Sequence, residues 1–363
     1  MNRAYRFRIY PNREQQEQLS KTFGCCRFLY NHMLADKIAE YERSGAMLRI
    51  TPAQYKKEYP WLKEVDSLAL ANVQLHLEAA YRNFFRNPSV GFPKFKSRHH
   101  SKDSYTTNVV NGNIRLDGNH LKLPKLSPVR IVLHREIPET MRLKSVTITR
   151  EPSGKYYASF LCTCENQAVE RAEVSRMLGI DYAMSGMAVF SDGTRAEYPM
   201  YYKNTQKKLA KEQRKLSHCE KGSRNYRKQQ KKVSLIHEKI RHQRHDYQHK
   251  LSASLSKAYD AVCVENLNMK GLSQSLHFGK SVMDNGYGAF LMKLEYKLEQ
   301  NGKKLVRIDR FYPSSKQCSR CGRIKKELSL SERIYLCECG NVIDRDVNAA
   351  INIREEGRRL LCA

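Results

Sequence analysis

Three carboxylates that stand beside short predicted elements constrain the C-terminal half of this chain more than any other feature of the sequence. Asp181 and Glu265 each end or interrupt a short apolar segment typical of a β-strand, and Asp346 opens an Ala-rich segment typical of a helix. A single acid of this kind is a weak signal, because caps and turns often use Asp. Three of them beside distinct elements of one α/β unit can converge, and converging carboxylates repel one another unless a cation binds them.

Oxygen ligands gathered in this way suit Mg²⁺ or Mn²⁺. Two such ions roughly 3.5–4 Å apart activate water and stabilise the leaving oxygen of a phosphodiester. The sequence therefore predicts a two-metal site held by Asp181, Glu265 and Asp346, which would act both as metal ligands and as catalytic residues.

The third acid has a competitor two residues before it. Asp344 and Asp346 would share a face of an extended segment, so their spacing does not choose between them. Asp346 stands where it can cap the following helix, and the small residues at 348–350 would let that helix pack close to a sheet. We therefore predict Asp346 as the ligand and Asp344 as a supporting or structural residue. Arg345 would either contact the scissile phosphate or be an ordinary surface charge.

Four of the eleven cysteines have the spacing of zinc ligands. Cys318 and Cys321 form a Cys-x₂-Cys knuckle, and Cys337 and Cys339 form a Cys-x-Cys knuckle after fifteen intervening residues. Four thiolates in two knuckles predict one closed, tetrahedral zinc site with a structural role. The second knuckle is one residue shorter than usual, so a defective or three-ligand site is the alternative. The other seven cysteines are scattered and predict packing residues or free thiols.

The charge of the chain predicts a polyanionic partner. Lys and Arg number 65 against 37 Asp and Glu, which gives a net charge of +28. Residues 203–250 form a predicted helical stretch with 16 Lys/Arg against 4 Asp/Glu. A solvated helical hairpin usually mixes charges to form i,i+4 pairs, so the excess of one sign favours contact with a phosphate backbone. The alternative is a ribosomal-type or merely well-solvated basic protein.

Two short segments carry a weaker signal of the same kind. Residues 91–98 interleave aromatic and cationic side chains, which suits base stacking and backbone contact. Residues 313–318 lead into the cysteine cluster with small donors and Lys316, a combination able to hold a phosphate. An ordinary surface loop is the alternative for each.

No segment resembles a signal peptide, and no run of about 18 apolar residues predicts a membrane span. Eleven cysteines without a secretion signal do not predict a disulfide framework. These observations lead us to expect a cytoplasmic protein with no membrane partner.

Periodicity in the first half predicts helices and then antiparallel strands. The N-terminal segment alternates as a strand. Helical periodicity follows over residues 12–43, as one helix or a helix pair, and over residues 70–84, with Asn12 and Gln15 in a capping-box arrangement. Short alternating segments with Gly-containing turns over residues 104–165 predict a small antiparallel barrel or sandwich. The first strand could complete this sheet, and the helices would then be an insertion between strands.

Strands alternate with helices in the second half. Strands are predicted within residues 178–190, at 260–265 and at 304–309, and helices are predicted at 283–300 and from Val347 onward. This alternation predicts a mixed α/β sheet.

Motifs spread over nearly the whole chain resemble those of TnpB, a family of transposon-encoded RNA-guided nucleases related to type V CRISPR effectors. The segments that carry the resemblance are Tyr5-Arg-Phe-Arg-Ile-Tyr-Pro-Asn, Phe23-Gly-Cys-Cys-Arg-Phe-Leu-Tyr-Asn, Phe92-Pro-Lys-Phe-Lys-Ser, Gly179-Ile-Asp, Val264-Glu-Asn-Leu, Tyr312-Pro-Ser-Ser-Lys-Gln-Cys-Ser-Arg-Cys-Gly and Asp344-Arg-Asp-Val-Asn-Ala-Ala. The last two are highly specific. The chain departs from the family pattern at Tyr182-Ala-Met-Ser and in the short second knuckle, but neither departure removes a predicted ligand.

The resemblance implies a multidomain α+β chain. Its expected parts are a wedge β-barrel at residues 1–11 and 96–170, an inserted helical recognition lobe at 12–95, and an α/β RNase H-like RuvC nuclease domain at 171–363, with the basic helical segment at 203–250 and a zinc ribbon at 314–343. The three RuvC acids correspond to Asp181, Glu265 and Asp346.

The activity implied is RNA-guided cleavage of transposon-associated DNA beside a short adjacent motif. The expected partners are a transposon-derived guide RNA, double-stranded DNA and the displaced single strand, bound by one protein chain in a ribonucleoprotein. The expected cofactors are two Mg²⁺ or Mn²⁺ ions and one structural Zn²⁺. A non-cleaving guided regulator of transcription or transposition is the main alternative, and a transposase that needs no guide is another. A binding protein has no need of three converging acids, so the triad favours the nuclease.

Overall fold

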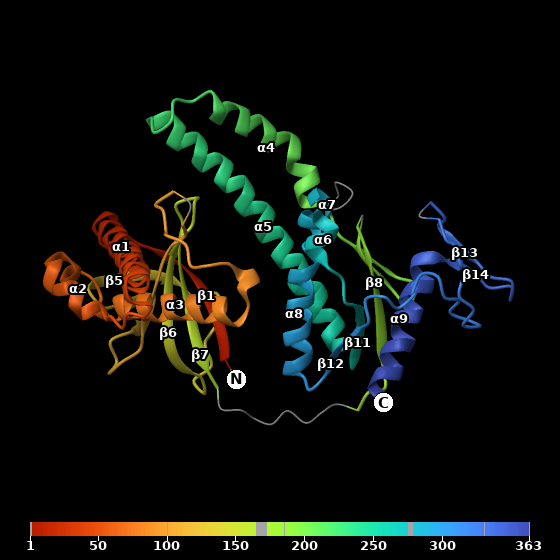
Figure 1. Cartoon of the computed structure of the whole chain (residues 1–363). Coiled ribbons are helices and arrows are strands. Elements are labelled where there is room, and N and C mark those ends of the chain that lie inside the picture. Colours follow the sequence, from red (N-terminus) through yellow and green to blue (C-terminus); the bar gives the residue numbers. More distant parts are fainter. Residues whose placement is uncertain are drawn as a thin grey trace. The chain divides into compact units, whose positions relative to one another are not determined.

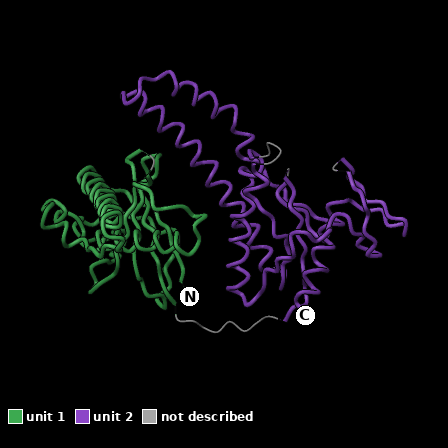
Figure 2. The backbone as a smooth tube through the Cα atoms, in the orientation of Figure 1, with its two compact units in different colours: residues 1–167 green, residues 168–363 purple. Residues whose placement is uncertain are grey.

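The computed structural model describes the chain except for Met1, His100, residues 165–172, Ser185, residues 275–278, Leu330 and Ala363. The chain divides into two compact units, residues 1–167 and 168–363 (Figure 2). The predicted boundary at 170/171 lies outside the described residues.

The first unit is a curled antiparallel sheet with helices. Among the described residues of this unit, seven strands run in the order β2-β6-β7-β1-β5-β4-β3, so β2 and β3 are the two edges of an open sheet rather than neighbours in a closed barrel. The strands are β1 (Asn2–Tyr10), β2 (Asp103–Asn108), β3 (Arg115–Asp117), β4 (His120–Leu123), β5 (Leu126–Val132), β6 (Arg142–Arg150) and β7 (Tyr156–Thr163). β1 pairs with β7 and β5 in the interior of the sheet, and the helices follow it in the chain.

These helices are α1 (Arg13–Ser44), α2 (Pro52–Glu58), α3 (Ser67–Arg86) and the short 3₁₀ helices η1 (Pro60–Glu64) and η2 (Pro88–Val90). The predicted capping box is confirmed, because Asn12 and Gln15 exchange hydrogen bonds at the start of α1. α1 is one uninterrupted helix and ends at Gly45, which adopts a left-handed conformation with φ of 70°. Buried side chains of α1, α3 and the sheet form one core, which includes Phe7, Leu29 and Leu77.

The second unit is a mixed sheet with helices on both faces. Its strand order is β10-β9-β8-β11-β12, in which β8, β11 and β12 are parallel and β9 and β10 are antiparallel to their neighbours. The strands are β8 (Met177–Ala183), β9 (Met187–Phe190), β10 (Arg195–Glu197), β11 (Ala261–Glu265) and β12 (Lys304–Ile308), and a separate hairpin contains β13 (Ile334–Leu336) and β14 (Val342–Asp344). The predicted strand within 178–190 is therefore two strands.

The helices of this unit are α4 (Tyr201–Ser217), α5 (Arg224–Ala258), α6 (Met269–Gln274), α7 (Gly279–Asn285), α8 (Tyr287–Gln300) and α9 (Arg345–Cys362). The predicted basic segment forms the helical hairpin α4–α5 (Figure 1). The predicted helix at 283–300 is interrupted at Gly286, whose φ of 59° separates α7 from α8.

Alternation along β8 and β11 assigns their side chains to the two faces of the sheet. Leu178, Ile180, Val262 and Val264 pack in a core with α5 and α8. The intervening residues face α9, and Cys263 packs there in a second, smaller core.

Two glycines allow α9 to lie directly on the strands (Figure 1). A Cβ at Gly179 of β8 would meet the backbone oxygen of Ala350 at 1.9 Å, and a Cβ at Gly357 of α9 would meet the Cys263 sulfur at 2.2 Å. Both distances are far below van der Waals contact, so no side chain fits at either position. This close approach brings the first turn of α9 to the ends of β8 and β11.

A buried carboxylate joins the starts of three strands in this sheet. Asp260 Oδ2 accepts hydrogen bonds from the Ser175 hydroxyl (2.9 Å) and the Arg176 N–H (3.0 Å), and Lys303 Nζ lies 3.4 Å from Oδ1. The Arg176 N–H and the Ser175 hydroxyl lower the pKa of Asp260 from 3.8 to about 2, and Lys303 contributes in the same direction. Asp260 therefore stabilises the folded state in its ionised form.

We expect Asp260→Asn to lower the free energy of unfolding at pH 7 by about 2 kcal/mol, since hydrogen bonds to a charged group are lost. The ionised carboxylate contributes fully above the unfolded pKa of 3.8, and its contribution disappears as pH falls through about 2. Melting curves should therefore show a variant-to-wild-type difference that narrows from pH 5 to pH 2.5. Asp246→Asn, an exposed acid on α5, is the control. A difference independent of pH would contradict this role.

Candidate functional site

The first two predicted acids lie at the ends of neighbouring parallel strands. Ile180 is paired with Val264 in the β8–β11 register, so Asp181 and Glu265 follow at the same level, and Glu265 is itself paired with Ile308 of β12. Both acids alternate with the core residues that face α8, and both therefore stand on the α9 side of the sheet.

Asp346 lies in the first turn of α9, which packs on that same side. Burial raises the pKa of Asp181 well above its ordinary value, and the negative charges of Glu265 and Asp346 raise it further, while Arg345 opposes them. Asp181 thus lies within electrostatic range of both other acids, although 165 positions separate it from Asp346. Burial also raises the pKa of Glu265.

The start of α9 corrects one prediction. Asp344, not Asp346, caps this helix, because Asp344 Oδ1 accepts hydrogen bonds from the N–H groups of Asp346 (3.0 Å) and Val347 (3.1 Å). A cap residue precedes the helix and reaches forward to its second or third N–H, and Asp346 is already inside the first turn. The Asp346 carboxylate is therefore not engaged in capping.

Two arginines balance the charge of Asp346. The guanidinium of Arg345 lies 3.3 Å from Asp346 Oδ1, and that of Arg195 lies 3.7 Å from Oδ2. The Arg345 side chain is only 14% exposed and also donates to the carbonyl of Ser329, so it is not an ordinary surface charge. A cationic group beside a carboxylate cluster can contact a phosphate that approaches the cluster.

The donor set of this site fits Mg²⁺ or Mn²⁺, which prefer carboxylate oxygens. The acids are less tightly gathered than the cysteines. Among the described residues, the four cysteines are the group of possible ligands whose binding atoms all lie within 4.8 Å of one another.

Ser314 is a residue of this site whose role the sequence did not predict. Its side chain is buried, and its hydroxyl donates a hydrogen bond of 2.5 Å to Glu265 Oε1. This hydrogen bond opposes the effect of burial on the pKa of Glu265. The segment 313–318 had only suggested small donors for a phosphate. Its Lys316 instead donates to the carbonyl of Lys326.

The four predicted zinc ligands come together. Cys318 and Cys339 sulfurs lie 3.7 Å apart, and those of Cys321 and Cys337 lie 3.6 Å apart. A tetrahedral ion with Zn–S bonds of about 2.3 Å requires sulfurs roughly 3.8 Å apart, so the cluster fits zinc. The short second knuckle still places both of its sulfurs in the cluster.

The local hydrogen bonds favour the thiolate form of Cys318. Burial alone would raise the pKa of the Cys318 thiol, but the N–H groups of Cys321 and Arg320 and the side chain of Asn341 lower it to about 6. Gly322 and Gly340, which follow the two knuckles, adopt positive φ angles of 77° and 81°. Both turns thus use conformations that glycine adopts without strain.

The segment at 91–98 divides into exposed and packed side chains. Phe92 and Phe95 are 44% and 58% exposed, which leaves their rings accessible for stacking. Lys96 does not extend into solvent in this way, because its ammonium group lies 3.8 Å from the centre of the Tyr30 ring.

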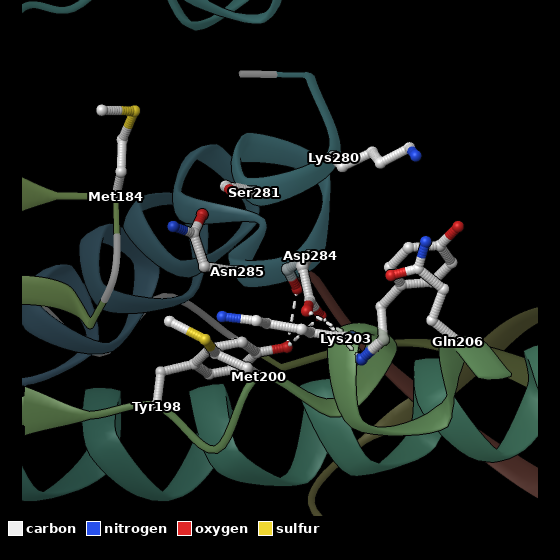
Figure 3. A pocket seen from close by; sticks show the side chains of 10 residues that line it. Met184, Tyr198, Met200, Lys203, Gln206, Lys280, Ser281, Asp284 and Asn285 are labelled. Carbon is white, nitrogen blue, oxygen red and sulfur yellow. Dashed lines mark hydrogen bonds between the residues drawn. The ribbon is translucent and has the colours of Figure 1, made fainter. Parts of the chain in front are cut away.

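A pocket of about 350 Å³ lies beside the start of α4 (Figure 3). Met200, the N-cap of α4, adopts a left-handed conformation with φ of 47° and supplies no capping side chain. Asp284 of α7 caps the helix instead, because its carboxylate accepts hydrogen bonds from the N–H groups of Tyr202 (3.0 Å) and Lys203 (3.1 Å). The Tyr198 hydroxyl also donates to the Asp284 carboxylate (3.1 Å). Asp284 is thus occupied as a helix cap, and we assign the pocket no catalytic role.

Among the described residues, no helix is both long and apolar enough to span a membrane.

The two helices of the basic hairpin are joined by side-chain hydrogen bonds. Gln229 of α5 joins it to α4 by donating to the backbone and side chain of Glu212.

Sequence comparison places the chain among known families. The family described as a probable transposase, OrfB_IS605, matches residues 159–276, the Cas12f1-like TNB domain matches residues 287–353, and a helix-turn-helix domain matches residues 1–46. In this last range the structure has β1 and the single helix α1.

Relatives match over almost the full length. A protein of Streptomyces pristinaespiralis named as an RNA-guided DNA endonuclease is 34% identical, with 98% of this chain and 90% of that protein covered. InsQ of Escherichia coli K12, which carries the same description, is 30% identical, with 99% and 93% covered. The solved structure of a Cas12f1–sgRNA–target DNA complex matches with a TM-score of 0.60 at 13% identity over 98% of both chains, which shows a shared fold.

Proposed function

Because the chain belongs to the TnpB-like family of RNA-guided DNA endonucleases, we propose that it cuts transposon-associated DNA at sites chosen by a bound guide RNA. The observation that carries the cleaving activity is the convergence of Asp181 and Glu265 at adjacent strand ends with Asp346 on the helix above them. A protein that only binds nucleic acid gains nothing from three acids that repel one another in a partly buried site.

Asp181, Glu265 and Asp346 would hold two Mg²⁺ or Mn²⁺ ions. When bound, such a pair supplies an activated water and stabilisation of the leaving oxygen of a phosphodiester. The chain's own contribution is to fix the carboxylates on three rigid elements. Arg345, whose guanidinium lies beside Asp346, would contact the scissile phosphate from the same side.

The two units suggest how the nucleic acids are held. We propose that the curled sheet is the wedge (1–11 and 96–170), that its helices are the recognition lobe (12–95), and that 171–363 is the RNase H-like RuvC nuclease with its zinc ribbon (314–343). The mixed five-stranded sheet supports this last assignment. The hairpin of α4 and α5, with its excess of Lys and Arg, would contact phosphates of the guide RNA or DNA.

Base pairing with the guide would select the target, and the protein would read only a short adjacent motif, as Cas9-type effectors do. A guided regulator of transcription or transposition is the alternative function. It would bind where the guide directs without cutting, and the intact triad does not favour it.

Reprogramming the guide tests this proposal directly. The purified protein should carry one enriched RNA, encoded beside the gene or overlapping its 3′ end. Replacing the terminal guide segment of that RNA should move Mg²⁺-dependent cleavage to the new matching sequence in a plasmid library randomised beside the target, because pairing chooses the site.

Other outcomes separate the alternatives. Binding that follows the guide without any cleavage would favour the regulator. Cleavage that stays at one site whatever the guide would overturn the proposal and indicate direct readout of DNA by the protein.

A further inference from the structure

A single loop connects the nuclease acids with the zinc cluster. Ser314, which donates to Glu265, stands four residues before Cys318, the first zinc ligand. The Tyr335 hydroxyl of β13 donates to the carbonyl of Lys316 between them (2.9 Å). The two predicted metal centres thus share one short stretch of backbone.

Two buried asparagines of α9 hold this loop. Asn352 Nδ2 donates to the carbonyl oxygens of Ser314 (2.8 Å) and Gln317 (2.7 Å). Asn348 Nδ2 also donates to Gln317 (2.7 Å), and its Oδ1 accepts from the Ser319 N–H (2.9 Å). On the same helix, Asn348 lies two residues after Asp346, and Asn352 lies one turn after Asn348.

These contacts explain why amides occupy a helix face that is otherwise apolar. Asn348 is 0% exposed and Asn352 is 3% exposed, beside the buried apolar residues Ala349 and Ile353. A buried amide destabilises a protein unless its donors and acceptor are satisfied, and Asn is a poor helix former. Their hydrogen bonds go to the loop, so the structural effect of these residues is to fix the loop against α9.

We propose that Ser314 is a positioning residue for Glu265, and that Asn348 and Asn352 make this positioning depend on the loop that enters the zinc cluster. The inference rests on the proposed function, in which Glu265 binds a divalent ion. With Oε1 held by Ser314, the carboxylate has one orientation, and Oε2 remains for the ion. Hydrogen bonds that orient a metal-binding carboxylate typically change metal affinity by about 10–100-fold when they are removed.

Binding of Mn²⁺, which uses the same oxygen ligands as Mg²⁺, provides a readout independent of cleavage. We expect calorimetric titration of the full-length protein with Mn²⁺ to show about tenfold weaker binding for Ser314→Ala. Ser314→Thr keeps the hydroxyl and should bind like wild type. Ser315→Ala is the matched control, because Ser315 is the exposed neighbour on the same loop. Zinc content should be unchanged in all three variants.

Glu265→Ala separates this inference from the proposed function. If Glu265→Ala loses Mn²⁺ binding and Ser314→Ala binds like wild type, the positioning role is wrong and the proposed metal site stands. If Glu265→Ala itself binds Mn²⁺ like wild type, both the site and the positioning role are wrong.

The second half of the proposal is tested from α9. Asn352→Ala should weaken Mn²⁺ binding in the same direction as Ser314→Ala, and the double variant should be no weaker than the more affected single variant, because both changes act through one contact. The concentration of Mg²⁺ that gives half-maximal cleavage should rise in parallel. Additive losses, or an Asn352→Ala protein that binds Mn²⁺ like wild type, would overturn the coupling. If Ser314→Ala fails to fold, Mn²⁺ binding by Asn352→Ala alone tests whether the loop positions Glu265.

Discussion

Replacing Asp181 with alanine is expected to abolish DNA cleavage and leave RNA and DNA binding almost unchanged. Loss of one carboxylate removes the geometry of a two-metal site, whereas phosphate contacts are made elsewhere on the basic surface. A decrease of about 10³-fold or more, which corresponds to about 4 kcal/mol of transition-state stabilisation, is expected. Glu265→Ala and Asp346→Ala should behave in the same way when plasmid cleavage and filter binding are compared.

Asp309→Ala is the control for these variants. Asp309 follows Ile308 at the end of β12, next to the strand that ends in Glu265, but its side chain is exposed and accepts from the Phe311 N–H. This variant should cleave at close to the wild-type rate. Cleavage at the wild-type rate by Glu265→Ala would remove Glu265 from the site.

Removal of zinc is expected to have the largest effect on stability. Purified protein should contain about one Zn²⁺ per chain, and Cys318→Ser should lose the ion together with the stability or solubility of the protein, because structural zinc in small domains contributes on the order of 10 kcal/mol to folding. Elemental analysis and thermal denaturation with and without a chelator provide the measurements.

Cys362→Ser is the control, since this cysteine is exposed and outside the cluster. It should retain both zinc and stability. An intact, soluble protein without zinc would show that the short second knuckle does not hold the ion.

Much of this site was predictable because local pattern and topology act together. A short apolar strand with an acid at or near its carboxyl end places that acid at one end of the sheet, and neighbouring parallel strands bring such ends together. The cysteine spacing was equally informative, since a zinc knuckle is a local structure. Neither prediction required knowledge of how distant loops pack.

The features that the sequence did not reveal depend on exact register or on remote contacts. Asp344 and Asp346 are chemically equivalent, and only the start of α9 at Arg345 decides that Asp344 caps it. Ser314 lies 49 residues from Glu265, and its role depends on a loop held by side chains of α9. Hydrophobic periodicity contains no information about such polar contacts.

The glycine contacts of α9 bear on how nuclease copies lose activity during evolution. Backbone rests on backbone at Gly179, and at Gly357 the helix backbone rests on the fully buried Cys263 side chain. A methyl group added at Gly179 must therefore move the helix, and with it Asp346, and a misplacement of about 1 Å can lower a catalytic rate about 100-fold. Inactive descendants can therefore arise while every acid and every basic residue is retained. Under the proposed mechanism, an intact triad in a related gene is necessary for cleavage but does not identify an active copy, and these two glycines are the further positions to inspect.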